Sequence, residues 1–283
     1  MNINTFYKIF YRHRFEKASL IRKIYLSFVL PYRYVINFLN LPKKINLDKL
    51  EKEKKDLLNN DLNFLFDYFN SDKGNYYENQ YVQPFKRTKE KIKAHGYGNF
   101  YEKYFKPVKD KKLNIMEIGS FYGNASASLF FYFQNSNFYA GDICPDLFRY
   151  NSKRVQNFYV NSSEEDSINE NIIKKNINFD IIIEDASHSH KDQIISLFML
   201  FKIINPGGMF IIEELDFPDT RKDMNVNNEK PTLRDVLNKI KLNDYTFESK
   251  YILNEEKEYF LKNFASIEIF KGNFNEIAII QKK

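Results

Sequence analysis

One strand, turn and helix segment constrains the fold more than any other part of the sequence. Residues 113–123 read LNIMEIGSFYG, and the small residues of 124–128 follow directly. A short apolar run bounded by glycine is typical of a buried strand that turns into a helix. Gly119 can take backbone dihedrals that a side chain forbids, and Gly123 lets the main chain approach a bound molecule. We therefore expect a ligand over this turn, against Ser120 and its neighbours.

The spacing of the turn argues against a dinucleotide site. Glu117 lies just inside the carboxyl end of the predicted strand and presents an acceptor to a molecule above the turn. The pattern is Glu-x-Gly-x-x-x-Gly, whereas the dinucleotide fingerprint is Gly-x-Gly-x-x-Gly. A second predicted strand, residues 137–142, ends in Asp142 at about the separation where open α/β sheets place a ribose-binding carboxylate. A turn or cap role is the alternative for Asp142.

Two later segments make the pattern more specific. With residues 179–184 and 206–213, the turn resembles that of the class I S-adenosylmethionine-dependent methyltransferases. Within that superfamily, the run D-A-S-H at 185–188 and the acid pair at 213–214 resemble the sugar O-methyltransferases of the macrocin and mycinamicin type. The resemblance covers about residues 70–283. It implies S-adenosylmethionine as methyl donor and a sugar hydroxyl, in a small molecule or glycan precursor, as acceptor.

Strands that alternate with helices predict a doubly wound α/β fold with right-handed crossovers. Further strands are expected at 155–161, 179–185 and 209–215, and helices at 126–133 and 190–204. The runs 265–270 and 275–281 are joined by a link too short for a crossover, which predicts a C-terminal hairpin with one antiparallel strand. The resemblance implies a Rossmann-like methyltransferase fold with a mostly parallel, seven-stranded sheet.

Three regions follow from these patterns. Residues 1–44 form a basic, aromatic helical arm, residues 45–110 a helical lid or linker region, and residues 111–283 the cofactor-binding methyltransferase domain. Within the second region, apolar periodicity predicts one helix over residues 47–69.

The second region also carries a short motif. Asp72 and Lys73 belong to a D-K-G sequence, and His95 opens H-G-Y, as in the segment that precedes the cofactor domain in the family named above. The resemblance implies that this segment covers the cofactor, so that Asp72 and Lys73 contact it. On chemistry alone, without the resemblance, a helix-stop role for Asp72 and a surface-turn role for His95 are favoured. The resemblance also implies adenine contacts from Asn161 and Ser162, although related enzymes often carry an acid in place of Asn161.

Acidic residues end two neighbouring strands of the predicted sheet. Asp185 ends the fourth strand, and Glu213 and Glu214 lie at the end of the fifth. Ligands of open α/β sheets bind at this edge, and an all-oxygen set favours a hard cation such as Mg²⁺. We expect all three carboxylates to bind the metal, with two solvated strand-end acids as the alternative. The family has Asp where Glu214 stands, so the longer side chain alters the coordination geometry.

His188 lies three residues beyond Asp185. An imidazole titrating near about pH 6.5 can accept a proton from a sugar hydroxyl that a metal has made more acidic. The resemblance assigns His188 this role as catalytic base, beside Asp185. His190 is the competing histidine, and its position predicts the start of a helix instead.

Charge is concentrated in the arm. The chain has a net charge of +6, but residues 1–44 hold nine basic residues and one acidic residue, a balance of +8, which leaves −2 for the remainder. This asymmetry argues against a nucleic-acid partner for the whole protein. Interleaved basic and aromatic residues suit an arm on an anionic membrane surface, and packing on the domain or on a second subunit, as a homo-oligomer, is the equal alternative.

Location and function class follow from the remaining features. Pro31 and Arg33 interrupt the apolar run 24–41, so we expect no spanning helix, and no signal-peptide pattern is recognised. A single cysteine, Cys144, is consistent with a reducing cytoplasm. The alternative functions are a non-catalytic cofactor-binding or membrane-associated interaction protein on the same fold, and a nicotinamide-dependent oxidoreductase. The grouped acids and His188 disfavour the first, and the turn spacing and terminal hairpin the second.

Overall fold

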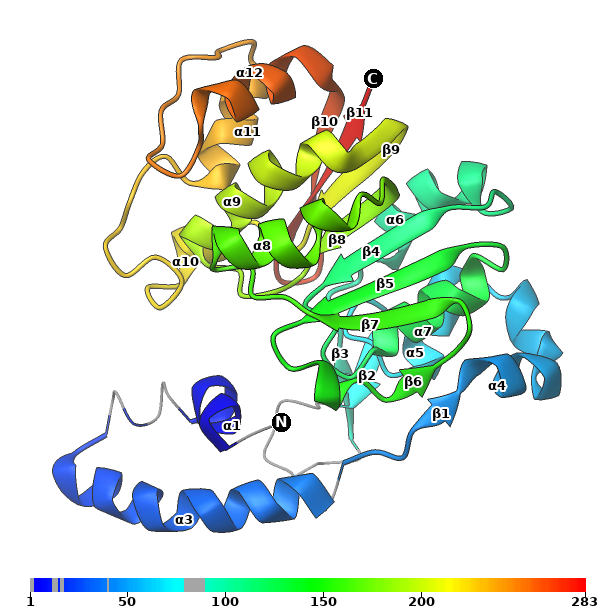
Figure 1. Ribbon diagram of the computed structural model, residues 1–283, viewed down its shortest axis with the longest axis vertical. Helices are drawn as coiled ribbons and strands as arrows, with labels where there is room; N and C mark the ends of the chain where they lie inside the picture. The colour runs from blue at the N-terminus through cyan, green and yellow to red at the C-terminus, as the bar shows by residue number, and fades with distance from the viewer. Residues whose placement is uncertain (1–2, 12–14, 16–17, 40, 79–89) are drawn as a thin grey trace.

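A seven-stranded sheet lies at the centre of the computed structural model, which describes residues 3–11, 15, 18–39, 41–78 and 90–283 (Figure 1). The strands are β4 (Asn114–Ile118), β5 (Asn137–Asp142), β7 (Val155–Tyr159), β8 (Phe179–Glu184), β9 (Ile204–Ile212), β10 (Phe264–Lys271) and β11 (Glu276–Lys282). Their order is β10-β11-β9-β8-β4-β5-β7. The five strands from β9 to β7 are parallel, and β11 runs antiparallel to both its neighbours. The predicted doubly wound sheet with its C-terminal hairpin is confirmed.

Helices cover both faces of this sheet, because successive side chains of each strand point to opposite faces. On one face, Ile115 and Ile181 pack with α4 (Leu47–Glu53), α5 (Leu62–Tyr68), α6 (Gly98–Phe105) and α7 (Asn124–Tyr132). On the other, Met116 and Ile182 pack with α8 (Glu165–Asn171), α9 (His190–Leu200), α11 (Leu233–Lys241) and α12 (Asn254–Asn263). The region 45–110 therefore shares a core with the sheet, and its division from residues 111–283 stays a prediction.

Short elements complete the described chain. Two-stranded pairs are formed by β1 (Ile45–Asn46) with β6 (Tyr150–Asn151) and by β2 (Tyr76–Glu78) with β3 (Lys91–Lys93). Helix α10 (Phe217–Thr220) follows β9. The 3₁₀ turns are η1 (Lys55–Asn59), η3 (Lys106–Val108), η4 (Pro145–Leu147), η5 (Ile173–Lys175) and η6 (Phe201–Ile203).

The single helix predicted over residues 47–69 is wrong. The segment is divided into α4, η1 and α5. Asn60 and Asp61 take extended backbone conformations, and the Asp61 carboxylate accepts a hydrogen bond from the Phe64 amide at 2.8 Å. This is an N-cap, so Asp61 starts a new helix where the apolar periodicity alone suggested continuity.

The predicted fifth strand, residues 209–215, is displaced. β9 begins at Ile204 and ends at Ile212, and the Pro-Gly-Gly sequence lies inside it, where the register with β8 shifts. Extended backbone does not continue far beyond the strand, because Glu214, two residues after Ile212, has φ +47°, in the left-handed region. The other strand and helix limits differ from the predicted ones by smaller shifts, apart from the predicted helix 190–204, which ends at Leu200 and continues as η6.

The N-terminal arm stands apart from the sheet layers (Figure 1). It consists of α1 (Ile3–Phe10) and α3 (Leu20–Leu39), which pack through a small cluster centred on Phe6, Tyr11 and Leu26. Among the described helices, none combines the length and the apolar character needed to cross a membrane.

The turn after β4 generates a stability prediction. Gly119 has φ +92°, and a Cβ placed there would lie 2.0 Å from the carbonyl oxygen of Asp185. Gly207 has φ +76°, but a Cβ there would meet nothing within 4 Å. Gly119→Ala and Gly207→Ala should each cost about 1–2 kcal/mol of backbone strain. Only Gly119→Ala should lose about 1–3 kcal/mol more through the clash. Urea unfolding of both variants measures the difference, and equal losses would contradict the packing described.

Candidate active site

The turn after β4 is fixed to the neighbouring strand. The amides of Gly119 and Ser120 both donate to the carbonyl of Gly141 in β5, at 2.8 and 3.2 Å. Gly123 precedes α7 with φ +83°, and the space that its missing side chain leaves is filled by the Phe148 ring. Gly119 has the unusual dihedral expected of it, at φ +92°, whereas Gly123, expected to let the main chain approach a ligand, is required by packing within the chain.

Asp142 stabilises the same turn through its side chain. Its carboxylate oxygens accept hydrogen bonds from the amides of Phe121, at 2.8 Å, and Cys144, at 2.6 Å. The side chain is buried, and burial raises the pKa of Asp142. Both oxygens thus serve as turn acceptors, the alternative role foreseen for this residue. Ribose contact requires their remaining lone pairs and stays a prediction.

Glu117 faces the interior beneath the turn. It is buried, and its carboxylate accepts a hydrogen bond from the Ser126 hydroxyl of α7. Burial raises the pKa of Glu117 to about 7. Lys73 lies 4.0 Å away, between the Nζ and Oε1 atoms. The acceptor predicted at the end of β4 is therefore oriented by both α7 and the region before β4.

Lys73 binds the acids that end the two central strands. The side chain is 1% exposed, and its ammonium donates to Asp185 and, at 2.9 Å, to Glu213. Although burial opposes its charge, these carboxylates raise the pKa of Lys73 well above its usual value. Tyr101 of α6 donates its hydroxyl proton to the other oxygen of Glu213. Lys73 is thus an internal cation of the carboxylate cluster.

A second group lies beside this cluster. Ligand atoms of Asp185, His188 and Glu214 all lie within 4.8 Å of one another. His188 Nδ1 is 3.5 Å from Glu214 Oε2, and His188 Nε2 is 3.8 Å from Asp185 Oδ1. These separations exceed ordinary hydrogen bonds, and within the described chain His188 Nδ1 and Glu214 Oε2 are buried without a hydrogen-bond partner. Buried polar atoms normally have partners, so the geometry fits an ion or a ligand group there.

Glu214 is also held from the opposite side. His95 Nε2 lies 3.3 Å from Glu214 Oε1, and Asn275 of the C-terminal hairpin lies 3.0 Å from His95 Nδ1. The Glu214 carboxylate therefore sits between two imidazoles. His95 comes from the H-G-Y motif, but its contact with Glu214 was not anticipated from the sequence.

The three carboxylates predicted to bind a metal do not converge equally. Asp185 and Glu214 share the group that contains His188, whereas Glu213 turns to Lys73 and Tyr101. The kink at Glu214 separates the directions of the two neighbouring side chains. Binding of an ion by Asp185, Glu213 and Glu214 together stays a prediction.

His188 is suited to accept a proton. Burial lowers the pKa of His188, so its imidazole is neutral near pH 7. Its ring meets the Phe217 ring edge-on at 5.4 Å. The segment after β9 thus borders His188.

The remaining predicted contacts lie at the edges of this site. Asp72 Oδ2 is 4.0 Å from His95 Nε2. Asn161 and Ser162 follow β7, where the Asn161 side chain accepts a hydrogen bond from the Ser163 amide at 3.2 Å. The hydroxyls of Ser163 and Ser187 both donate to Asp192, which joins this loop to the one carrying His188. Adenine contacts from Asn161 and Ser162 stay a prediction.

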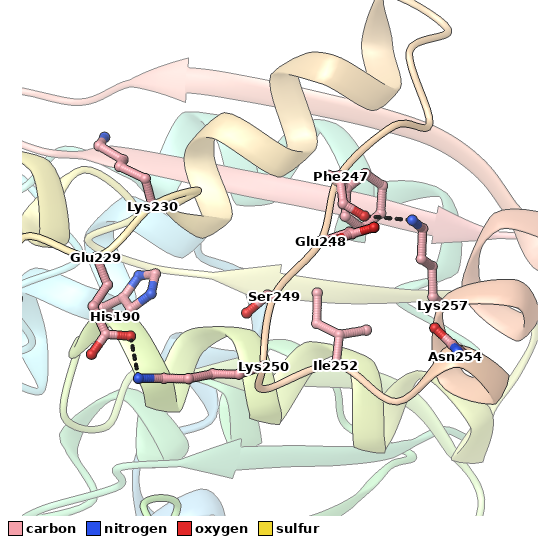
Figure 2. Close-up of a pocket in the computed structure, with 10 residues that line it drawn as sticks. All are labelled: His190, Glu229, Lys230, Phe247, Glu248, Ser249, Lys250, Ile252, Asn254 and Lys257. Atoms are coloured by element: carbon pink, nitrogen blue, oxygen red, sulfur yellow. Dashed lines mark hydrogen bonds and ion pairs between the residues drawn. The ribbon is translucent and has the colours of Figure 1, made fainter.

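A cavity of about 500 Å³ lies beyond the start of α9 (Figure 2). Its wall contains His190, which is the first residue of α9 as predicted, with Glu229 and Lys250 paired at 2.9 Å. Lys230 also lines it and pairs with Asp219 at 2.7 Å. Asp185, His188 and Glu214 are not part of this wall, so the cavity is separate from the carboxylate site.

Known proteins share parts of this architecture. No protein-family model matches the chain. One curated relative, the 8-demethyl-8-alpha-L-rhamnosyl tetracenomycin-C 2'-O-methyltransferase of Streptomyces olivaceus, is 29% identical over 128 residues, 43% of this chain and 33% of that protein. The chain therefore spans about a third of that relative's length.

Solved structures show the same fold. MycE methyltransferase from the mycinamycin biosynthetic pathway, in complex with Mg and SAH, superposes with a TM-score of 0.59 at 17% identity. The match covers 79% of this chain and 54% of MycE. A second crystal form gives a TM-score of 0.60. The match to MycE confirms the predicted methyltransferase fold. With the curated relative, it also confirms that the chain is similar to sugar O-methyltransferases, as predicted.

The burial of Lys73 predicts a large cost for its removal. Lys73→Met leaves Asp185 and Glu213 without their cation, and breaking a buried ion pair costs about 3–5 kcal/mol. Lys103→Met is the control, because Lys103 and Glu268 form an exposed pair at 2.8 Å and such pairs contribute about 0–1 kcal/mol. Urea unfolding at neutral pH compares the variants. Similar losses would show that Lys73 does not neutralise the cluster.

Glu184 predicts a pH dependence of stability. The side chain is fully buried, and burial, with the neighbouring Asp185, raises the pKa of Glu184 to about 8 from an ordinary 4.5. Between these two pH values, the Glu184 carboxyl therefore keeps its proton in the native state and has lost it in the unfolded state. The stabilisation is complete below the ordinary pKa and declines as pH rises toward 8, by up to about 1.4 kcal/mol per pH unit.

Replacing this carboxyl tests the assignment. Glu184→Gln does not titrate and keeps an acceptor for the Ala186 amide, so its free energy of unfolding should fall less steeply than that of the wild type between about pH 5 and pH 8. Glu255→Gln, at the exposed first turn of α12, serves as the control. Parallel wild-type and Glu184→Gln profiles in urea unfolding would contradict the raised pKa.

Proposed function

We propose that the chain is an S-adenosylmethionine-dependent O-methyltransferase that acts, with Mg²⁺, on a hydroxyl of a sugar or of a glycan precursor. One observation carries this proposal: the His188 imidazole lies within 3.8 Å of the carboxylates of both Asp185 and Glu214, at the sheet edge that bears the glycine turn. The methyltransferase fold and the curated sugar O-methyltransferase relative support it.

The proposed donor site surrounds the turn after β4. Its members are the residues predicted from the sequence: Glu117, Gly119, Ser120, Gly123, Asp142, Asn161, Ser162, Asp72 and Lys73. The partly buried carboxylate of Asp185 gives this site negative charge, and so does Glu117 above its raised pKa of about 7; negative charge favours a sulfonium cofactor. Lys73 donates one hydrogen bond to Asp185 and one to Glu213. Because an ammonium has three donors, one donor is left for a further acceptor.

For the ion we keep the predicted ligands Asp185, Glu213 and Glu214. Mg²⁺ takes oxygen ligands, so His188 stays available for proton transfer. Each Glu213 oxygen that already accepts one hydrogen bond has a second lone pair. When bound, the ion would supply acidification of the acceptor hydroxyl.

His188 performs the proposed proton transfer. The acceptor oxygen forms a bond to the sulfonium methyl carbon while the carbon–sulfur bond breaks, and the hydroxyl proton passes to the imidazole. Asp185 and Glu214, within 3.8 Å of the ring nitrogens, stabilise the imidazolium that forms. Phe217 and the turn after β4 position the two substrates, and this alignment supplies much of the acceleration.

We also propose a cytoplasmic location with peripheral contact between residues 1–44 and the inner face of the membrane. The chain's single cysteine, Cys144, and the basic arm support this location. Assembly with a second copy through the arm is the competing partner.

Calorimetric titration with S-adenosylmethionine, with and without Mg²⁺ and with NAD as control, tests the donor assignment. A folded protein that binds NAD but not the sulfonium cofactor would overturn it. His188→Asn then tests the base. Asn tolerates the left-handed backbone of His188, at φ +56°, so the fold should persist.

His188→Asn should lower the rate of sugar methylation by about 10²–10⁴ while cofactor binding is retained. His190→Asn is the matched control, because His190 faces the separate cavity. Its rate should stay near that of the wild type. A product assay by mass spectrometry over a panel of sugar acceptors measures both, and an unchanged rate in His188→Asn would remove the base assignment.

A further inference from the structure

The outer face of α3 is an exposed apolar stripe. At 100° per residue, positions 21, 25, 28, 32, 35 and 39 fall on one side of the helix. The side chains there are large and open to solvent: Ile21 (82% exposed), Tyr25 (58%), Phe28 (80%), Tyr32 (65%), Val35 (51%) and Leu39 (74%). Isolated exposed apolar residues are ordinary, but a continuous stripe of this length marks an interaction surface.

The fold of the arm does not need this stripe. The opposite side of α3 carries the packing: Leu26 meets α1 in the small cluster with Phe6 and Tyr11. Arg33 on that side donates to the Tyr11 hydroxyl at 3.0 Å. The outer face is thus separate from the contacts that hold α1 and α3 together.

The charges around the stripe have one sign. Residues 18–44 contain no Asp or Glu. Arg22, Lys23, Lys43 and Lys44 are exposed around the helix and in the segment that follows it. In this part of the chain an apolar, aromatic face is therefore accompanied only by cations.

We propose that the outer face of α3 lies on an anionic lipid surface. Aromatic and aliphatic side chains enter the boundary between headgroups and acyl chains, and the cations meet the lipid phosphates. A second copy of this chain would bring the same cations together, and the stripe lacks the flanking acids that pair with bases in a coiled coil. Charge complementarity therefore selects the anionic bilayer. This surface specifies the peripheral contact proposed above and does not depend on methyl transfer.

A short connection joins the arm to the turn after β4. Leu41 packs against a cluster of Tyr122, Cys144 and Leu147 beside that turn. The Ile45 amide donates to the Arg149 carbonyl at 2.8 Å, and the Arg149 amide donates to the Tyr122 carbonyl at 3.0 Å. A lipid surface under α3 is thus connected to the proposed donor site through a few residues, which suits an acceptor carried by the membrane.

Two substitutions separate the stripe from charge alone. Phe28→Asp and Ser27→Asp each add one negative charge to an exposed position of α3, but only Phe28→Asp removes an apolar side chain from the stripe. Full-length protein is sedimented with vesicles of phosphatidylcholine alone and of phosphatidylcholine mixed with phosphatidylglycerol. Wild-type protein should bind the mixed vesicles, and less at high salt.

The expected affinities differ between the variants. Ser27→Asp should weaken binding about fivefold through charge. Phe28→Asp should weaken binding at least about tenfold further, because the bilayer loses contact with the phenyl ring. Val35→Asp provides a second change within the stripe, and retained S-adenosylmethionine binding would show that the fold and the donor site are intact.

Three outcomes would overturn the proposal. They are failure of the wild type to bind mixed vesicles, equal losses in Phe28→Asp and Ser27→Asp, and light scattering that shows a dimer dissociated by Phe28→Asp. The last would assign the stripe to a second copy. Loss of S-adenosylmethionine binding in the wild type, with vesicle binding intact, would instead count against the proposed function alone.

Discussion

The buried ion pairs of Lys73 organise the proposed active site. Transfer of carboxylates away from water is costly unless a partner of opposite charge accompanies them. Asp185 and Glu213 come from the ends of β8 and β9, while Lys73 comes from the region before the sheet. The requirement for charge neutralisation therefore docks that region on the sheet edge. Tyr101 of α6 strengthens the same attachment by donating to Glu213.

A second constraint joins the donor turn to the proposed catalytic residues. The backbone of Asp185 and Ala186 runs directly against Gly119, so close that a Cβ atom would not fit. The Asp185 amide also donates to the Ile118 carbonyl at 2.9 Å, which continues the ladder between β4 and β8 beyond the strands. The turn that would hold the methyl donor and the loop that carries His188 thus share one backbone contact. A shift in either segment would be transmitted to the other.

Most of the fold could be predicted from the sequence because short-range residue patterns mark the strands of the sheet. Apolar runs such as 179–184 mark buried strands, and the short link before residue 275 permits only an antiparallel neighbour. The break between α4 and α5 was missed because Asp61 reads as a polar residue on a helix face until its side chain is seen to cap the next helix.

The side chains of the site were harder to predict. Lys73 is 112 residues from Asp185 and 140 from Glu213 along the chain, and no local pattern links them. The different directions of Glu213 and Glu214 depend on one backbone angle at Glu214, which residue types do not specify. His95 contacts Glu214 on one side of its ring and the hairpin residue Asn275 on the other, and both partners lie far from it along the chain. Motifs identified the participants, and long-range packing decided their partners.

The distribution of charge connects the two proposals physically. The carboxylates of the site attract cations, whereas the arm carries a balance of +8 against −2 for the remainder of the chain. If the arm lay over the carboxylates, its lysines and arginines would compete with a metal ion and a sulfonium for the same acids. The small core of Phe6, Tyr11 and Leu26 gives the arm an internal structure of its own. Its cations can then meet an external anionic surface, and the acids remain available at the sheet edge.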